Sequence, residues 1–285
     1  MKRKIKAIEV RGMNFCCPKC GGELCEQDGV FRCENRHCYD RAKSGYINLL
    51  SGAGGVHGDD KRMVQARRAF LDGGGYRPLM KEVAEWSREL LPSGGVLLDC
   101  GCGEGSYTAA VSEALLASGK EASVLGVDIS KDAVALAAKR AKRGKFAVAS
   151  VFHLPLSDRS VDGILNLFAP MVAGEYARVL RAGGWVMKAT PLPEHLYELK
   201  AAVYDRPYLT QPEPERWEGF DLWEKREVKF SLLLQDNAEV QSLFEMTPYC
   251  YTTPRSGMER LAKLSSLTVT AAFCLALYRK KEGAE

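Results

Sequence analysis

Long apolar runs are missing from this sequence. No stretch of about 18 consecutive apolar residues occurs, so we expect no transmembrane helix and no membrane partner. The first ten residues are basic but no apolar segment follows them, so we expect no secretory signal and a cytoplasmic location. Internal repeats and long low-complexity stretches are also absent. The 285 residues therefore indicate a globular protein with one large domain and an appendage, or with two modest domains.

Cysteine, by contrast, is abundant and unevenly placed. Six of the ten cysteines form a cluster near the N-terminus: Cys16, Cys17, Cys20, Cys25, Cys33 and Cys38. A secreted disulfide scaffold would spread its cysteines over a short chain behind a signal peptide. A local cluster in a larger, cytoplasmic protein indicates a metal site instead.

The spacing Cys17-x2-Cys20-x12-Cys33-x3-His37 predicts a structural zinc site. Zinc takes four thiolate or imidazole ligands in a tetrahedron, and four protein ligands leave no open position for catalysis. The neighbouring Cys38 could replace His37 in an all-cysteine site. Cys16 is a further ambiguous neighbour, and Cys25 is expected to be a small buried or surface residue.

Positive charge is concentrated in the N-terminal segment. Residues 1–45 contain ten Lys or Arg and six Asp or Glu, whereas the other 240 residues contain thirty of each. This segment indicates a docking surface for a polyanion, or else a solvated basic tail. If its side chains act as a group, affinity for the polyanion falls steeply with salt. The phosphate-binding candidates are Lys19, Arg32, Arg36, Arg41, Arg67 and Arg68.

After two helices expected at 60–71 and 77–91, strand and helix patterns alternate. This alternation predicts an α/β fold with a parallel sheet and helices on both faces. The last two strands are expected to form an antiparallel pair at one edge, and residues 205–224 have no assignment. The expected strands are 96–100, 123–128, 146–150, 161–168, 184–190, 228–234 and 267–278, and the expected helices are 106–117, 131–142, 173–180, 194–204 and 238–244.

We divide the chain into three parts. Residues 1–48 are expected to form a zinc-binding module that docks a polyanion and whose folding depends on the metal. Residues 49–94 contain a glycine-rich linker and the two first helices. Residues 95–285 are expected to form the α/β domain.

A glycine-rich turn follows the first strand of that domain. Its sequence, Asp99-Cys-Gly101-Cys-Gly103-Glu104-Gly105, is neither a dinucleotide fingerprint nor a phosphate-binding P-loop. It resembles the methyltransferase motif D-x-G-x-G-x-G. Asp128, at the end of the second strand, occupies the position that meets a nucleoside ribose. Together they favour S-adenosylmethionine over a nicotinamide cofactor or a turn without a ligand, and a Rossmann-like class I methyltransferase sheet.

The loops after the third and fourth strands carry further candidates. Asn166 and Pro170 form a polar–proline motif of the kind that contacts the target base in N-methyltransferases, although Asn166 could merely end its strand. His153, in the loop after the third strand, is as well explained as a surface residue. No side chain is a clear general base, and Asp162 and His153 are only candidates.

Several short motifs in order resemble the bacterial 23S rRNA (guanine-N1)-methyltransferases over nearly the whole chain. The motifs are Cys-Pro-Lys-Cys (17–20), Cys-Glu-Asn-Arg-His (33–37), Gly-Tyr-Ile-Asn-Leu-Leu (45–50), Gln-Ala-Arg-Arg-Ala-Phe-Leu-Asp (65–72), Gly-Tyr-Arg-Pro-Leu (75–79), the glycine-rich turn, Phe-Ala-Pro (168–170), Gly-Gly-Trp (183–185) and Ala-Thr-Pro (189–191) with His195.

The resemblance implies methyl transfer to guanine N1 in a hairpin loop of 23S rRNA, with the zinc module helping to hold the RNA and no DNA partner. It also implies that Tyr76, Gly103, Glu104 and His195 lie against the cofactor. Residues 165–170 look closer to the branch linked to tylosin-type macrolide resistance, which acts at position 748, than to the branch acting at position 745. A homodimer stays open.

Two rival functions share parts of this pattern. A small-molecule methyltransferase, such as a quinone-modifying enzyme, would have the glycine motif but no use for a basic zinc module. A non-catalytic RNA-binding protein with a methyltransferase fold would have no need of the intact Asp99, glycines and Asp128.

Overall fold

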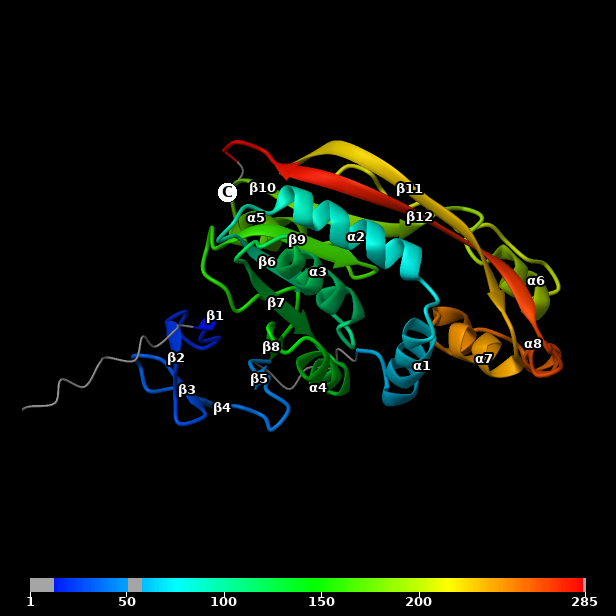
Figure 1. Cartoon of the computed structure of the whole chain (residues 1–285), viewed down its shortest axis with the longest axis horizontal. Helices are drawn as coiled ribbons and strands as arrows, with labels where there is room; N and C mark the ends of the chain where they lie inside the picture. Colours follow the sequence, from blue (N-terminus) through cyan, green and yellow to red (C-terminus); the bar gives the residue numbers. More distant parts are fainter. Residues whose placement is uncertain (1–12, 51–57, 284–285) are drawn as a thin grey trace, which may run out of the picture.

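The computed structural model describes residues 13–50 and 58–283 of the chain. The N-terminal part forms a small sheet with strand order β1-β2-β3-β4 in which all neighbours are antiparallel (Figure 1). Its strands are β1 (Met13–Cys16), β2 (Glu23–Gln27), β3 (Val30–Arg32) and β4 (Cys38–Asp40). Figure 1 shows this sheet at one end of the molecule.

The main sheet has eight strands in the order β11-β12-β10-β9-β6-β7-β8-β5. Strands β5 to β10 run parallel, and β12 is antiparallel to both β10 and β11. From β6 the chain continues to β7 and β8 on one side of the sheet, whereas from β9 it continues to β10 on the other side. The strand order therefore switches between β6 and β9. Their bounds are β5 (Ile47–Asn48), β6 (Val96–Cys100), β7 (Ser123–Asp128), β8 (Lys145–Val148), β9 (Val161–Leu167), β10 (Leu180–Pro191), β11 (Phe220–Leu234) and β12 (Leu267–Lys280).

Side-chain caps fix the starts of several helices. The carboxylate of Asp60 accepts a hydrogen bond from the Met63 amide at 2.8 Å, and Ser130 and Asp236 cap two later helices in the same way. The helices are α1 (Lys61–Asp72), α2 (Arg77–Leu90), α3 (Ser106–Ala117), α4 (Lys131–Arg140), α5 (Ala173–Val179), α6 (Tyr197–Val203), α7 (Asn237–Glu245), the 3-10 helix η1 (Pro248–Tyr251) and α8 (Arg255–Leu261).

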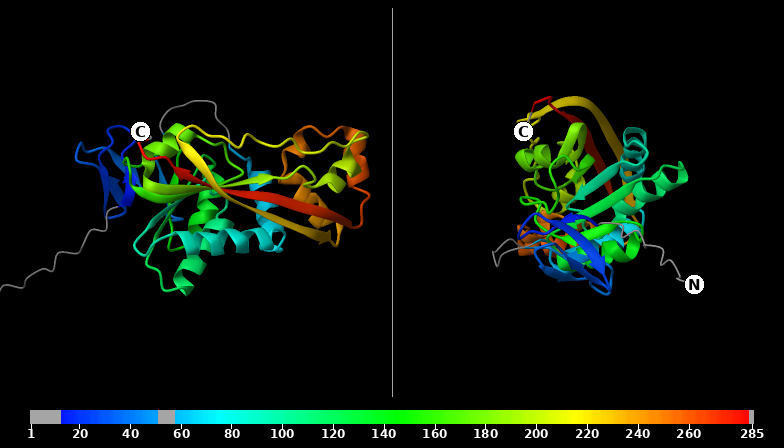
Figure 2. Two further views of the ribbon diagram at one scale, coloured as in Figure 1. Left: turned by 90° about the horizontal axis from the view of Figure 1, so that it is seen from above. Right: turned by 90° about the vertical axis from the view of Figure 1, so that its left-hand side faces the viewer.

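Apolar residues face both sides of the main sheet. In β6, Leu97 points into a core shared with α2 and α3, and Leu98 points into a second core shared with Tyr176 of α5. The left view of Figure 2 shows α2 and α3 on one side of the sheet and α5 on the other. The expected α/β sheet with helices on both faces is therefore confirmed.

The expected elements hold best in the first half of the main sheet. The bounds of β6, α3 and β7 agree with expectation, whereas α4 ends two residues earlier than expected, at Arg140. The largest difference is β11, which begins at Phe220 within the unassigned region. Within residues 221–227, five residues are charged and the two apolar ones, Leu222 and Trp223, are adjacent and exposed, so the segment shows no apolar alternation. Pairing with β12 extends the strand through it. Neither η1 nor α8 was expected.

The zinc module covers part of the second core. The connection from β8 to β9, residues 149–160, has no helix, although a parallel crossover usually carries one. Leu154 and Leu156 of this connection instead join one apolar cluster with Phe15, Leu24 and Phe31 of the small sheet. The Cys16 amide donates to the Pro155 carbonyl at 2.7 Å. The small sheet is therefore packed into the fold.

The three-part division of the chain stays a prediction, although β5 lies at its first boundary and is bonded to β8 of the main sheet. Within the described ranges, no helix combines the length and apolar character needed to cross a bilayer.

One arginine fastens the connection on which the zinc module rests. The Arg178 guanidinium donates to the carbonyls of Leu154 and Leu156 at 2.9 and 2.7 Å. It also forms ion pairs with Glu175 at 2.6 Å and Asp158 at 2.8 Å. These contacts raise the pKa of Arg178 further above its usual range, chiefly through its bond to Glu175.

We expect Arg178→Met to lower the free energy of unfolding by about 2–4 kcal/mol, because it leaves two carbonyls and Glu175 without their donor. Denaturant titration with zinc held constant measures this change. Arg143→Met, at an exposed arginine without such a network, should stay within about 0.5 kcal/mol of the unmodified protein. Equal effects of the two substitutions would contradict the role of Arg178.

Candidate cofactor cavity and zinc site

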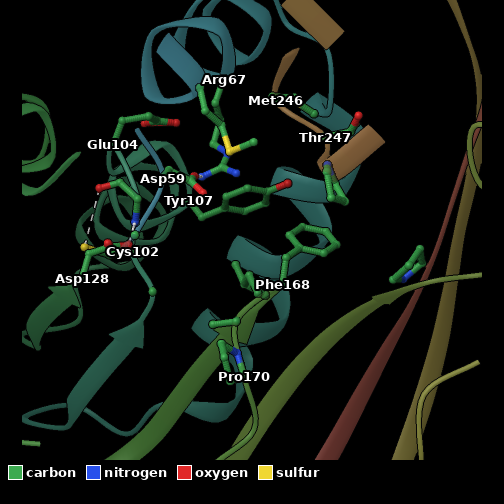
Figure 3. Close-up of a pocket in the computed structure, with 18 of the residues that line it drawn as sticks. Asp59, Arg67, Cys102, Glu104, Tyr107, Asp128, Phe168, Pro170, Met246 and Thr247 are labelled. Carbon is green, nitrogen blue, oxygen red and sulfur yellow. Dashed lines mark hydrogen bonds and ion pairs between the residues drawn. The ribbon is translucent and has the colours of Figure 1, made fainter. Parts of the chain in front are cut away.

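A cavity of about 1020 Å³ opens at the carboxyl ends of the central strands (Figure 3). This is where the strand order switches, which is the usual ligand position in open α/β sheets. Loops after β6, β7, β8 and β9 form one part of its wall. Residues of α1, of the segment after α6, and of the segment from α7 to η1 form the rest.

Three positions of the glycine-rich turn require glycine because of their backbone conformation or their close contacts. Gly101, Gly103 and Gly105 have φ values of +77°, +54° and +87°, which L-residues rarely adopt. A Cβ on Gly101 would lie 2.7 Å from the Cβ of Ala169, and one on Gly105 would lie 2.7 Å from the Cα of Ala137. Gly101 and Gly103 line the cavity, whereas Gly105 does not and serves the packing of α3 against α4.

Asp128 is held facing this turn. Its carboxylate accepts hydrogen bonds from the Gly103 amide at 2.9 Å and the Ser130 amide at 2.8 Å. Burial nevertheless raises the pKa of Asp128 above its usual range. Asp128 lines the cavity, so an oriented carboxylate stands at the end of β7 where a ribose would be bound.

Asp99 and Glu104 add two more buried carboxyls to the cavity wall. The Thr108 hydroxyl donates to Asp99 at 2.5 Å, and the Ser106 amide and hydroxyl donate to Glu104 at 3.0 and 3.2 Å. Burial raises the pKa of Asp99 to about 7 and raises that of Glu104. Three acids around one cavity favour a ligand with positive charge.

A buried hydroxyl without a partner in the cavity wall also indicates a ligand. The buried hydroxyl of Tyr107 has no hydrogen-bond partner among the described residues, and its side chain lines the cavity. Arg67 is paired with Asp59 beside it, and Figure 3 shows these three side chains together with Glu104. The cavity thus offers carboxylates for the ammonium and sulfonium charges of S-adenosylmethionine and a guanidinium for its carboxylate.

Tyr76 and His195 lie deeper in the cavity wall. Burial, with the nearby charge of Lys200, lowers the pKa of His195 to about 4, so the ring is neutral at pH 7. Its Nδ1 accepts from the Ala272 amide at 3.2 Å, which leaves the proton on Nε2, 3.5 Å from the Tyr76 hydroxyl. Neither ring nitrogen is free to accept another proton.

Asn166 is fully buried and does not line the cavity. Its amide nitrogen donates to the Pro170 carbonyl at 2.9 Å and the Tyr176 hydroxyl at 2.7 Å, and its oxygen accepts from Lys188 at 3.2 Å. Every polar atom is used within the protein, so the expected contact with a base is not available in this arrangement. Pro170 does line the cavity, and Asn166 holds its carbonyl.

The two candidate general bases lie elsewhere. His153 is exposed and does not line the cavity. Asp162 lies at the amino end of β9, where it accepts from the Val96 amide at 2.7 Å and pairs with Arg181. That end of the strand is opposite to the one that carries the cavity.

Sequence patterns missed the later segments of the wall. The segment after α6 contributes Tyr208 and Thr210, and the segment between β11 and β12 contributes Met246, Thr247 and Tyr249. Aromatic residues beside proline were their only local signal.

The expected zinc ligands form one cluster. Donor atoms of Cys17, Cys20, Cys33 and His37 lie within 4.8 Å of one another. The His37 Nδ1 is 3.4 Å from the sulfurs of Cys17 and Cys33, and the sulfurs of Cys20 and Cys33 are 3.6 Å apart. Tetrahedral zinc with bonds of about 2.0–2.3 Å places neighbouring ligand atoms roughly 3.5–3.8 Å apart, so the residues fit the ion.

The cluster also decides between the two candidates for the fourth ligand. Cys38 is exposed, and its thiol points to the Arg36 carbonyl at 3.3 Å rather than into the cluster. The sulfur of Cys16 lies 3.1 Å from the Ser157 hydroxyl. His37 is therefore the fourth member of the cluster.

Comparisons with known proteins agree with both sites. Residues 97–184 match the family model described as a methyltransferase domain, and residues 15–51 match the zinc-ribbon model described as RlmA, N-terminal. A protein of Micromonospora griseorubida, provisionally named a 23S rRNA (guanine-N(1)-)-methyltransferase, is 34% identical over 292 residues, covering 92% of this chain and 96% of that one. The chain belongs to the 23S rRNA (guanine-N1)-methyltransferase family. It is an S-adenosylmethionine-dependent methyltransferase with a structural zinc ribbon.

Two more relatives support this membership. The 23S rRNA (guanine(748)-N(1))-methyltransferase of Streptomyces fradiae is 40% identical over 190 residues, which cover 66% of each chain. A protein of Bacillus subtilis strain 168, provisionally named in the same way as the Micromonospora protein, is 29% identical over 266 residues, covering 90% of this chain and 93% of that one.

Substitution of a ligand should release zinc, whereas substitution of its neighbour should not. We expect Cys33→Ser to lose the bound zinc and to lower the melting temperature by about 5 °C or more, because the ribbon shares a core with the main sheet. Cys38→Ser is the matched control and should keep one zinc per chain. Metal analysis and thermal unfolding test this, and zinc loss from both variants would restore Cys38 as a ligand.

The buried carboxyls predict that cofactor affinity rises with pH. Asp99 is mostly protonated at pH 6 and mostly ionised at pH 8, because burial and the neighbouring Asp128 and Glu104 raise its pKa to about 7. If the positively charged cofactor binds the ionised form, the dissociation constant should fall by up to about tenfold across this range. Calorimetry measures it. Asp99→Asn should bind weakly with a flatter pH dependence, and an unchanged slope would reject the assignment.

Proposed function

We propose that this enzyme transfers a methyl group from S-adenosylmethionine to N1 of a guanine in a hairpin loop of 23S rRNA, with position 748 favoured over position 745. The observation that carries the proposal is a single cavity with two differently lined ends. One end has the carboxyls of Asp99, Glu104 and Asp128, and the other has Phe168, Pro170 and several tyrosines. The names of the relatives support guanine N1 as the acceptor, and the Streptomyces fradiae name supports position 748.

The size of the cavity suits two occupants. Pockets for one small ligand usually enclose about 300–1,000 Å³, and this cavity is at the upper limit with about 1020 Å³. We place the adenosine and amino-acid parts of the cofactor along Gly101, Gly103 and Asp128, with Tyr76, Glu104 and His195 in the same wall. Gly105 supports the turn from behind. The remaining room can take a base that has left its stack.

The target guanine is placed beside Phe168 and Pro170. Phe168 has a φ of +65°, a strained conformation for a residue with a side chain, and its ring is 49% exposed at the cavity. The turn carrying it touches the glycine-rich turn, since Ala169 lies against Gly101. A base against Phe168 and Pro170 would therefore lie next to the cofactor.

In the reaction, the bond between the methyl carbon and sulfur breaks as the bond to N1 forms, and N1 loses its proton. The donor supplies the activated methyl group, and the chain supplies alignment, which can contribute roughly 7–11 kcal/mol. His195 has no free nitrogen to take the proton. The buried acids of the cavity wall surround the cofactor end, so we assign proton transfer to water.

Asn166 acts as a positioning residue in this proposal. We expect Asn166→Ala to lower kcat by roughly tenfold or more, because the Pro170 carbonyl loses the shorter of its two hydrogen bonds and keeps only the one from Tyr176, while the cofactor dissociation constant stays within about twofold. Single-turnover kinetics and calorimetry separate these quantities. An equal loss in cofactor affinity and turnover would remove the proposed role.

The acceptor itself can be identified with labelled cofactor. Tritium should pass to 23S rRNA and not to a lipid extract, and a strain lacking the enzyme should lose a reverse-transcriptase stop, because methylation at N1 blocks base pairing. The stop is expected at guanine 748, the position in the name of the Streptomyces fradiae relative. A stop at 745 would reject the site preference, and transfer to lipid would favour the small-molecule alternative.

The zinc ribbon supplies a basic surface for the same RNA. Lys19, Arg32 and Arg36 are exposed and form no ion pair with any described carboxylate. Arg41 is paired with Glu26, Arg67 with Asp59 and Arg68 with Asp72, so these three contribute less. We expect log K for a structured RNA to fall with log salt with a slope of about −2 to −2.7, the value for three neutralised phosphates. Filter binding between about 50 and 200 mM salt measures the slope, and a flat response would reject this footprint.

A further inference from the structure

Three tyrosines form a wall of the cavity that neither the cofactor nor the guanine accounts for. Tyr208 comes from the segment after α6, and Tyr249 and Tyr251 come from η1. Tyr208 is 50% exposed and Tyr251 is 66% exposed. These side chains form the tyrosine wall. Large aromatic rings gathered at the mouth of a cavity indicate a binding surface.

The tyrosine wall is held in place from beneath. Lys200 is fully buried, and its ammonium group donates to the Tyr208 carbonyl at 3.1 Å and the Thr210 hydroxyl at 2.7 Å. It also lies 5.1 and 5.6 Å from the ring centroids of Tyr208 and Tyr249. One cation thus ties two segments that are distant in the sequence, so the rings are arranged before any ligand arrives.

A second contact fixes the same two segments. The Tyr204 hydroxyl lies 2.9 Å from that of Thr252, just after η1, and the Tyr204 ring lies 5.7 Å from the ring of Tyr208. Tyr251 has a looser environment, since its hydroxyl makes one long bond of 3.4 Å to Asp60. The ring of Tyr251 can therefore be removed with little effect on folding.

We propose that the tyrosine wall is a second nucleobase subsite, which stacks an unpaired base adjacent to the methylated guanine. This inference rests on the proposed function. The wall belongs to the same cavity as the acceptor site, so a nucleotide next to the guanine in the RNA chain is within reach of it. Unpaired bases stack on aromatic rings whatever their identity, which suits a hairpin loop.

The test is a double-mutant cycle between protein and RNA. Tyr251→Ala is combined with a 23S rRNA hairpin in which either nucleotide flanking the target guanine is abasic. On the intact hairpin, the substitution should raise the RNA dissociation constant about tenfold, the size expected for one lost stacking contact, and should leave cofactor affinity unchanged. On the hairpin that lacks the base bound by the wall, the RNA dissociation constants of Tyr251→Ala and the unmodified enzyme should differ by less than about twofold.

Two control variants make the result specific. Tyr251→Phe keeps the ring and should bind RNA like the unmodified enzyme. Tyr197→Ala removes a tyrosine that is 38% exposed outside the cavity wall and should also have no effect. Loss of affinity in Tyr251→Phe, or an equal loss on intact and abasic RNA, would overturn the stacking subsite. Failure of the unmodified enzyme to methylate the intact hairpin would overturn the proposed function instead.

Discussion

The close approach of two backbone turns is the constraint on which the site depends. The turn after β6 and the turn after β9 meet where Gly101 faces Ala169, with no room for a side chain between them. Gly105 is equally close to Ala137, so the first turn is wedged between α4 and the second turn. Because these strands flank the switch in strand order, the cofactor surface and the acceptor surface are fixed relative to each other by the sheet itself.

Electrostatics then divides the cavity that these turns create. The carboxyls at one end are buried, so their charge is costly without a cation, and a sulfonium ligand relieves that cost. A protonated histidine in the same wall would repel this ligand. Burial and Lys200 keep His195 neutral, and its bond from the Ala272 amide fixes the tautomer. The same Lys200 supports the tyrosine wall, so one buried cation acts on both the histidine and the tyrosines.

Local patterns predicted the parts of the structure whose constraints are local. The glycine turn, the starts of the capped helices, β6, β7 and the zinc ligands all depend on residues close in sequence, and their positions agree with expectation to within a residue. The start of β11 and the tyrosine wall depend on pairing between distant segments, which leaves no periodicity to detect. The prediction that Asn166 lies near the end of its strand is correct. Its burial depends on Tyr176 and Lys188, which come from other elements.

The zinc ribbon packs against the main sheet and is not attached to it by the chain connection alone. It covers the apolar surface that a crossover helix would otherwise cover, and rotating it away would expose Leu154 and Leu156 to water. Residues 149–152 of the same connection line the cavity, and Pro155 receives the bond from Cys16. A basic surface carried on such a core stays at a fixed distance from the cavity. In the proposed function, phosphates held by Lys19 and Arg32 would therefore help to select which loop nucleotide reaches the methyl group.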